Sequence, residues 1–243
     1  AIIPARMGSS RFPNKPMAKI LGKPMIGHVY DNVKNNEIIS DLAVATCDNE
    51  IKEYIESIGG LAIMTSSKHE RASDRCSEAL LKIEEKYNKK YDIVVMIQGD
   101  EPMVCPEMIT EAIQPMLDNP DILITNLLGK IKDKLEFEDQ NCIKVVCDLN
   151  GDALYFSREA IPNNSTIDCI SMGKQICIIP FRRDFLLKYN SMVPTELEIA
   201  ESIDMLRVLE HGLKVRMVPT KYSTHAVDTK DDLYVVEKIL SKK

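Results

Sequence analysis

Positively charged and small side chains gather in the opening stretch AIIPARMGSSRFPNKPM. Arg6, Arg11 and Lys15 follow a short apolar run, and Gly8 and Ser9 lie among them. The N–H groups and hydroxyls of such a loop can wrap a polyphosphate, while arginine and lysine side chains bind its oxygens. The stretch matches neither G-x-x-x-x-G-K-[ST] nor G-x-G-x-x-G, two common nucleotide fingerprints. It predicts a phosphate-binding loop, with a solvated basic turn as the alternative.

Two acidic segments contain candidate metal ligands. Asp100 follows an apolar run in VVMIQGDEP, and Asp228 follows a shorter one in THAVDTKDD. Carboxylate oxygens suit a divalent cation such as Mg²⁺, so both residues are candidates. Gln98, two residues before Asp100, can hydrogen-bond a polar substrate. The alternatives are an acidic turn before a proline for Asp100 and a helix cap for Asp228.

A third segment, ERASDR, combines helix-start residues with a cation. Ser73 and Asp74 are typical of the beginning of a helix. Arg75 would then lie in the first helical turn, close to the end of the preceding strand. We expect it to point toward the same crevice as the basic loop.

The elements that must position these residues alternate between strands and helices. Strands are predicted at 1–5, 41–47, 61–66 and 91–100, and helices at 24–36, 49–60 and 72–90. This alternation of strands and helices predicts an α/β fold with a mostly parallel sheet flanked by helices. The carboxyl ends of parallel strands share one edge of the sheet, which is where open α/β sheets bind ligands. The basic loop and QGDEP should therefore face each other across one crevice.

The second half of the chain is richer in extended segments. These are predicted at 121–131, 142–157 and 174–181, and the Asn150–Gly151 pair indicates a tight hairpin turn. One long helix is expected over 195–212, followed by a strand at 213–220 and a last helix from about Asp231. The sequence contains no obvious linker. We therefore expect a single domain, 1–243, with a β-rich insertion at about 121–213 between parts at 1–120 and 214–243.

Composition limits the classes of partner. The formal net charge of −6 argues against general nucleic-acid binding, and the chain has neither a membrane-spanning apolar run nor a signal-peptide pattern. The seven cysteines form no C-x-x-C pair, so free thiols in a reducing cytoplasm are expected rather than disulfides or zinc. The predicted protein is cytoplasmic, with no nucleic-acid or membrane partner.

Six segments, in order along nearly the whole chain, resemble motifs of the 3-deoxy-manno-octulosonate (Kdo) cytidylyltransferases, also called CMP-Kdo synthetases. They are IIPARMGSSRFPNKPM, SDRCSEA, MIQGDEP, IKVVCDLNGDALYFSR, EIAESIDMLRVLEHG and AVDTKDDL. The resemblance is specific because sialic-acid cytidylyltransferases share only part of this set. It implies a CTP- and Mg²⁺-dependent nucleotidyltransferase with a Rossmann-like fold. It also implies a homodimer, with the β-rich insertion serving acceptor binding and dimerisation.

The resemblance also implies roles for individual residues. The implied nucleotide-binding residues are Pro4, Ala5, Arg6, Gly8, Ser9, Arg11, Lys15, Ser73 and Arg75; the implied catalytic residues are Arg6, Lys15, Asp100 and Asp228. Asp100 and Asp228 would bind Mg²⁺ together. The anomeric hydroxyl of the sugar acid would attack the α-phosphorus of CTP in line, and pyrophosphate would leave.

The acceptor side departs from the family pattern. The implied acceptor-binding residues are Arg11, Gln98, Arg158, Gln175 and Asp204. Gln175 stands at the usual His position, Ile179 at a Tyr position and Asp204 at a Glu position. An unpaired buried hydroxyl costs about 1–3 kcal/mol, so such changes can alter the preferred acceptor. Kdo is the predicted acceptor, with 8-amino-Kdo, another ulosonic acid or a phosphonate as alternatives.

Two other classes of protein remain as alternatives. A metal-dependent glycosyltransferase can share this type of sheet, but it normally carries D-x-D, which QGDEP lacks. A non-catalytic nucleotide-binding protein would not need both acidic segments together with Lys15. Release of pyrophosphate distinguishes the predicted enzyme from both.

Overall fold

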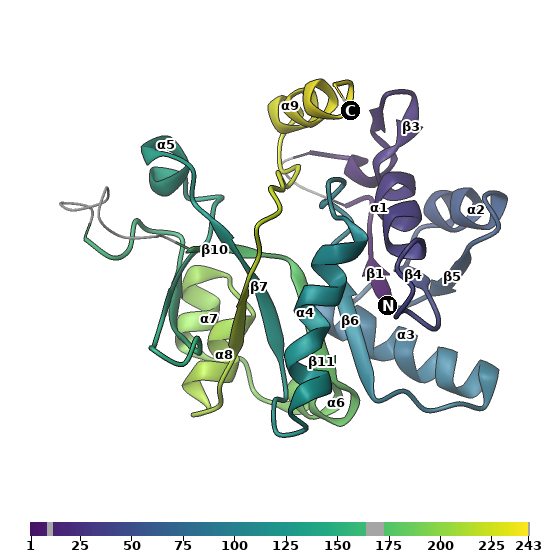
Figure 1. Ribbon diagram of the computed structural model, residues 1–243. Coiled ribbons are helices and arrows are strands. Elements are labelled where there is room, and N and C mark those ends of the chain that lie inside the picture. Colours follow the sequence, from purple (N-terminus) through teal and green to yellow (C-terminus); the bar gives the residue numbers. More distant parts are fainter. Residues whose placement is uncertain (9–11, 164–172, 243) are drawn as a thin grey trace. The chain divides into compact units, whose positions relative to one another are not determined.

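The computed structural model describes residues 1–8, 12–163 and 173–242. The chain forms two compact units (Figure 1). The first comprises Ala1–Thr110 and Thr224–Lys243, and the second comprises Glu111–Ser223. The first and last parts of the chain therefore belong to the same unit.

A parallel sheet forms the centre of the first unit. Four strands of this sheet belong to the first unit, in the order β6-β1-β4-β5: β1 (Ile2–Pro4), β4 (Ala43–Thr46), β5 (Leu61–Met64) and β6 (Ile93–Ile97). Ile2 pairs with Ala43 on one side and Met96 on the other. All residues of β1 and β4 are buried, as expected for strands covered on both faces. The predicted parallel sheet is confirmed.

Helices and a short hairpin surround this sheet (Figure 1). They are η1 (Lys15–Met17), β2 (Lys19–Ile20), β3 (Lys23–Pro24), α1 (Met25–Lys34), α2 (Asn49–Ser57), α3 (Ala72–Tyr87) and α9 (Lys230–Leu240). Phe12, which lies within the basic loop, packs in one apolar cluster with Val227 and with Val236 of α9. This cluster holds the basic loop and the acidic segment around Asp228 against the same core.

The second unit contains a mixed five-stranded sheet. It is built from β7 (Thr125–Lys130), β8 (Lys144–Cys147), β9 (Ala153–Ser157), β10 (Gly173–Ile176) and β12 (Arg216–Pro219), in the order β12-β7-β10-β8-β9. Only the β12–β7 pair is parallel among these described strands. The predicted hairpin turn joins β8 to β9. Gly151 adopts φ +81°, and the Asp148 carboxylate accepts the N–H groups of Asn150 and Asp152.

The predicted long helix over 195–212 is wrong. Two short helices, α7 (Glu196–Glu201) and α8 (Met205–Glu210), occupy this segment, and Ser202 between them has φ 54°. The Arg207 guanidinium makes two 2.7 Å hydrogen bonds with Glu198, and both side chains are buried. In one straight helix these residues would be separated by about 13 Å of rise. The break at Ser202 lets them form a buried ion pair.

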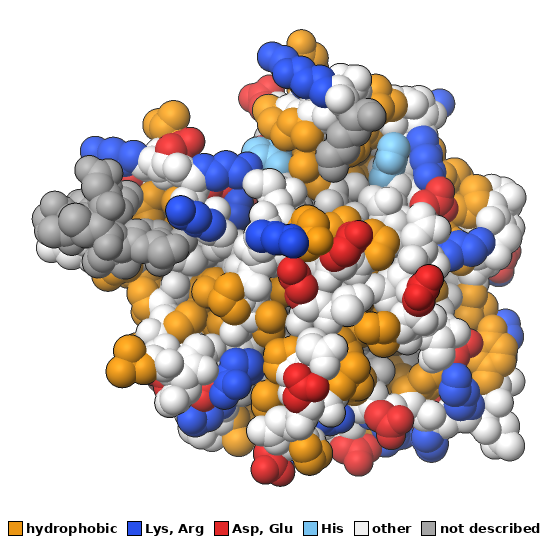
Figure 2. Space-filling view, in the orientation of Figure 1, with side chains coloured by type: hydrophobic (Ala, Val, Ile, Leu, Met, Phe, Trp, Pro, Cys, Tyr) orange, Lys and Arg blue, Asp and Glu red, His pale blue; other side chains and the backbone are white. Residues whose placement is uncertain are grey.

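The remaining elements are α4 (Pro106–Asp118), α5 (Lys134–Glu138), β11 (Ile178–Arg182) and α6 (Arg183–Ser191). Within the described part of the chain, no helix combines the length and apolar character that crossing a membrane requires. Figure 2 shows acidic and basic side chains interspersed over one face of the molecule. On that face the charges are mixed rather than separated by sign.

Candidate active site

The basic loop begins where β1 ends. Pro4 and Ala5 are buried, and the Ala5 N–H donates to the Ala45 carbonyl at 2.9 Å, which extends the strand pairing. Arg6 is the first exposed residue. The Met7 N–H then donates to the Asp48 carboxylate at 2.8 Å. This bond ties the start of the loop to the segment that follows β4.

The loop closes on itself at its far end. The Asn14 N–H donates to the Met7 carbonyl at 3.2 Å, and Gly8 is exposed. Ser9 and Arg11, which we expect to bind phosphate, lie outside the described residues. Their predicted roles remain predictions.

Lys15 brings the two acidic segments together. Its ammonium lies 2.7 Å from Oδ2 of Asp100 and 3.5 Å from Oδ1 of Asp228, and it donates to the Val227 carbonyl at 2.8 Å. These side chains are mostly buried, with exposed fractions of 13% for Lys15 and 21% for each aspartate. Two carboxylates far apart in the sequence thus converge on one cation.

The backbone explains why Asp100 and Asp228 converge. The Val227 N–H donates to the Asp100 carbonyl at 2.9 Å, so the two acidic segments are hydrogen-bonded directly. Gly99 lies against β1: a Cβ at this position would approach the Pro4 carbonyl oxygen to 3.2 Å. The absence of a side chain at Gly99 therefore lets the ends of β6 and β1 pack closely.

Asp232 in the first turn of α9 holds the segment that carries Asp228. Its carboxylate accepts the N–H groups of Asp228 at 3.1 Å and Thr229 at 2.8 Å, and it lies 2.9 Å from Nε2 of His225. Thr229 and Asp232 form a reciprocal capping box. Burial would raise the pKa of Asp232, but these hydrogen bonds lower it. Thr229 rather than Asp228 is therefore the cap of α9.

The predicted nucleotide residues Ser73 and Arg75 lie in the first turn of α3, and both are buried. Nη1 of Arg75 donates to the Thr65 hydroxyl, whereas Nη2 has no hydrogen-bond partner among the described residues. An unsatisfied buried donor is costly, and a bound ligand can satisfy it. This orphan donor fits the expected nucleotide role of Arg75.

Arg11, one of the predicted acceptor residues, lies outside the described residues, and the other four are divided between the units. Gln98 is half-buried directly after β6 in the first unit, whereas Arg158, Gln175 and Asp204 belong to the second. The Gln175 amide on β10 donates to Asn126 Oδ1 on β7 at 2.6 Å. Asp204 precedes α8, and its carbonyl accepts the Tyr189 hydroxyl at 2.9 Å.

Known proteins resemble this chain over nearly its whole length. The family model described as cytidylyltransferase matches residues 1–216. The 3-deoxy-manno-octulosonate cytidylyltransferase of Geobacter metallireducens is 43% identical, over 98% of this chain and 96% of the relative. That of Geobacter sulfurreducens is 40% identical over 100% and 98%. The chain belongs to the 3-deoxy-manno-octulosonate cytidylyltransferase family.

A solved structure supports the same family membership. CMP:2-keto-3-deoxy-manno-octonic acid synthetase complexed with CTP superposes on this cytidylyltransferase with a TM-score of 0.89. The two sequences are 35% identical, and the match covers 99% of this chain and 97% of that one. The expected Rossmann-like α/β fold and the expected enzyme class, a nucleotidyltransferase, are confirmed.

Three residues that support the site in this cytidylyltransferase were not predicted from the sequence. Asp48 anchors the basic loop, Asp232 holds the Asp228 segment, and Glu101, which is 3% exposed, accepts the Thr224 hydroxyl at 2.7 Å. The signal for Asp232 was T-x-x-D at the start of the last helix, a capping-box pattern. For Asp48 and Glu101 the only sequence signal was their position after a strand, and many acidic residues share that position.

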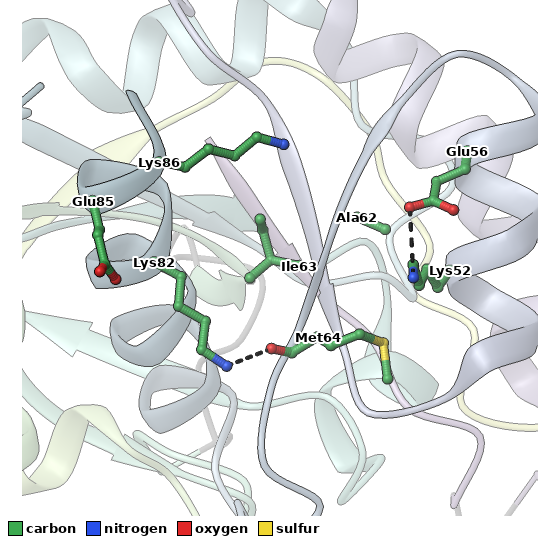
Figure 3. Close-up of a pocket in the computed structure, with 8 residues that line it drawn as sticks. All are labelled: Lys52, Glu56, Ala62, Ile63, Met64, Lys82, Glu85 and Lys86. Atoms are coloured by element: carbon green, nitrogen blue, oxygen red, sulfur yellow. Dashed lines mark hydrogen bonds and ion pairs between the residues drawn. The ribbon is translucent and has the colours of Figure 1, made fainter. Parts of the chain in front are cut away.

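A separate groove of about 460 Å³ lies beside the edge strand β5, between α2 and α3. Figure 3 shows the Lys82 side chain reaching from α3 to the Met64 carbonyl on β5, and Lys52 paired with Glu56 on α2. Charged side chains that cover a strand edge hinder pairing with another strand. In this cytidylyltransferase the groove is formed by residues other than the proposed nucleotide-binding ones.

Proposed function

We propose that this enzyme transfers CMP from CTP to the anomeric hydroxyl of Kdo and releases pyrophosphate. The observation that carries the proposal is the convergence of Lys15, Asp100 and Asp228 beside the basic loop. A triphosphate needs both fixed cations and a metal site, and these side chains provide the two together. The named relatives and the CTP-complexed structure support the choice of nucleotide and acceptor.

In the proposed reaction, the anomeric oxygen of the acceptor forms a bond to the α-phosphorus of CTP. The bond from that phosphorus to the bridging oxygen breaks, pyrophosphate leaves with the electron pair, and the hydroxyl proton passes to solvent. Negative charge grows on the phosphoryl oxygens in the transition state. Arg6 and Lys15 would stabilise that charge, which is how fixed cations accelerate phosphoryl transfer.

Asp100 and Asp228 would hold Mg²⁺. The Lys15 ammonium already occupies a position close to both carboxylates, so the pair has room for a cation. No cluster of three or more His, Cys, Asp or Glu side chains suited to a metal occurs in the described part of the chain. Two carboxylates suit Mg²⁺, which is commonly bound by one or two carboxylates together with substrate phosphates and water. When bound, the ion would neutralise charge on the phosphates and polarise the α-phosphoryl group.

The other nucleotide contacts follow from the loop and from α3. The backbone at Pro4 and Ala5 would contact the base, and Gly8 would let the loop approach the phosphates. Ser73 and Arg75 would hold the nucleoside, with Nη2 of Arg75 gaining a partner. Gln98, Arg158, Gln175 and Asp204 would bind the acceptor, Arg158 through the acid group.

We also propose a homodimer and a cytoplasmic location. The dimer would form through the second unit, whose edge strand β9 exposes Leu154. Five cysteines in the described part of the chain are free thiols, which suits a reducing compartment: Cys47, Cys76, Cys105, Cys142 and Cys147.

The test is pyrophosphate release with CTP and Mg²⁺ against Kdo, 8-amino-Kdo, sialic-type acids and small phosphonates. We expect turnover with Kdo and its loss, by about 10²–10³-fold, in Asp100→Asn and Asp228→Asn. Glu85→Asn, an exposed change on α3, serves as the control. Turnover with another acid alone would contradict the acceptor assignment. Release of a nucleoside diphosphate would instead indicate a glycosyltransferase.

A further inference from the structure

Arg158 follows β9 and is held by neutral groups. Its Nε, Nη1 and Nη2 donate to the backbone carbonyls of Glu201 at 2.7 Å, Gln140 at 3.0 Å and Ser202 at 3.3 Å. Two of these carbonyls belong to the end of α7, where a helix leaves acceptors without intrahelical partners. The hydrogen bonds fix the guanidinium but leave its positive charge uncompensated by a carboxylate at those three contacts.

The remaining donors of Arg158 suit an acid. A guanidinium has five N–H groups, and these three bonds use one on each nitrogen. One N–H on each terminal nitrogen is left outside them. A carboxylate binds arginine best through paired N–H···O contacts, so a fixed Arg158 is equipped to bind an acidic acceptor.

The Glu201 carboxylate fixes the backbone of the same residue. Its Oε2 accepts the Arg158 N–H at 2.8 Å, and its Oε1 accepts the Ser157 hydroxyl at 2.8 Å and the Tyr155 hydroxyl at 3.4 Å. Three donors from the end of β9 thus meet one carboxylate. Because the Glu201 carbonyl also binds the guanidinium, one residue of α7 orients both the backbone and the side chain of Arg158.

Lys144 supports the arrangement from β8. The residue is fully buried, and its ammonium donates to the backbone carbonyls of Asp139, Cys142 and Arg158. Burial lowers the pKa of this lysine. These bonds hold the Arg158 carbonyl and also the turn that supplies the Gln140 carbonyl to the guanidinium.

We propose that Glu201 is a positioning residue for recognition of the acceptor's acid group, acting through Arg158. This inference rests on the proposed function, since it assumes an acidic acceptor. Glu201 does not bind the acceptor itself. It fixes the guanidinium in one orientation before the acceptor arrives, and preorganisation of this kind lowers the cost of binding.

Glu201→Gln tests the proposal. The amide presents an NH₂ group at one of the two positions where the carboxylate accepts bonds, so the end of β9 that aims Arg158 is held less firmly, although the carbonyl bonds to the guanidinium remain. Turnover is measured by pyrophosphate release for Kdo and for its carboxamide analogue, which lacks the negative charge. We expect the ratio of kcat/KM for the acid to that for the carboxamide to fall about tenfold, with KM for CTP unchanged within about twofold.

Glu210→Gln is the matched control. Glu210, at the end of α8, accepts the N–H groups of Leu197 and Glu198 on α7, the helix that carries Glu201, and neither bond involves Arg158. This variant should leave the acid-to-carboxamide ratio unchanged. If Glu201→Gln does not fold, Ser157→Ala, which removes one donor to Glu201, should lower the ratio about threefold.

The outcomes separate the two claims. Absence of turnover with Kdo in the unmodified enzyme overturns the proposed function. Turnover in the unmodified enzyme, with equal losses for acid and carboxamide in Glu201→Gln, overturns the positioning role, because a purely structural defect affects both substrates alike. An unchanged ratio in the folded Glu201→Gln variant, or in Ser157→Ala if it must serve instead, overturns that role as well.

Discussion

Lys15 lies between the two carboxylates proposed to bind Mg²⁺ and close to the loop proposed to bind the triphosphate. In the structure its ammonium contacts Asp100 and Asp228, so it neutralises part of their charge. In the proposed reaction the same ammonium would contact phosphate oxygens while the two carboxylates bind Mg²⁺. The lysine would thus exchange its carboxylate partners for phosphate ones when the metal and nucleotide bind.

Lys15→Met is expected to separate these two effects. Without the ammonium, the two carboxylates repel each other, and a divalent cation can relieve that repulsion. We expect Mn²⁺ to bind about tenfold more tightly in the absence of nucleotide, measured by electron paramagnetic resonance, while turnover falls by about 10²-fold or more. Lys23→Met, which removes an ion pair with Asp31, is the control and should change neither quantity. Weaker Mn²⁺ binding in Lys15→Met would contradict this role.

At the scale of elements, helix termini hold the residues of the site. The first turn of α9 fixes the Asp228 segment through Asp232, and the start of α3 carries Ser73 and Arg75. The loop before α3 is held in turn by Glu78, whose carboxylate accepts the Ser66 N–H and contacts His69 and Lys82. Caps and loop anchors of this kind connect secondary structure to the position of each functional side chain.

Asp232→Ala should destabilise the protein and weaken metal binding. It removes the acceptor for two N–H groups and half of a capping box. We expect the free energy of unfolding in urea to fall by about 1–2 kcal/mol and the Mg²⁺ concentration for half-maximal turnover to rise. Asp231→Ala, at the exposed neighbouring position, should change the free energy by less than about 0.5 kcal/mol. Equal effects of the two variants would refute the assignment.

Glu78 should make stability depend on acid pH. Partial burial alone would raise the pKa of Glu78, but hydrogen bonds from Lys82, Ser66 and His69 lower it to about 2. A carboxyl with a lowered pKa contributes full stability above its unfolded pKa, about 4.3, and loses it as pH falls toward 2. Glu78→Gln should therefore cost on the order of 1 kcal/mol at pH 6, and less at pH 3.

The measurement is urea unfolding of Glu78→Gln and of the unmodified protein between pH 6 and pH 3. Glu85→Gln on the same helix is the control, because its carboxylate is exposed. A difference between Glu78→Gln and the unmodified protein that grows as the pH falls would have the wrong sign for this explanation.

At the scale of the whole molecule, the ends of the chain complete one unit and the middle forms the other. The first unit carries the proposed nucleotide and metal residues, and the second carries Arg158, Gln175 and Asp204. The second unit also exposes apolar side chains on its hairpin and edge strand, including Leu149 and Leu154. Exposed apolar residues of this kind can mark an interface.

Leu154→Glu should weaken the proposed homodimer. The leucine is 62% exposed on β9, and a charge there would be buried without a partner at an interface. Light scattering after gel filtration should give twice the 27.4 kDa chain mass for the unmodified protein and a value closer to one chain for the variant. Leu81→Glu on α3 is the control and should remain dimeric. A monomeric unmodified protein at micromolar concentration would contradict the dimer.

The strands and helices of the first unit could be predicted from the sequence because their signals are local. Continuous apolar runs predicted β1, β4 and β6, and helical periodicity predicted α1, α2 and α3. The residue types of the site could also be predicted, since a basic loop and two acidic segments suggest a phosphate and a metal. These inferences depend on neighbours within a few residues.

Only the tertiary structure decided how distant residues meet. Lys15 reaches Asp100 across 85 residues because the Val227–Asp100 hydrogen bond and the apolar cluster around Phe12 bring three segments together. The segment over 195–212 has the pattern of one helix, but the Glu198–Arg207 pair and the carbonyls bound by Arg158 favour a break at Ser202. Helix propensities differ by only tenths of a kcal/mol per residue, whereas a hydrogen bond to a charged group contributes about 1.5–3 kcal/mol. Long-range buried bonds therefore determine where the helix breaks.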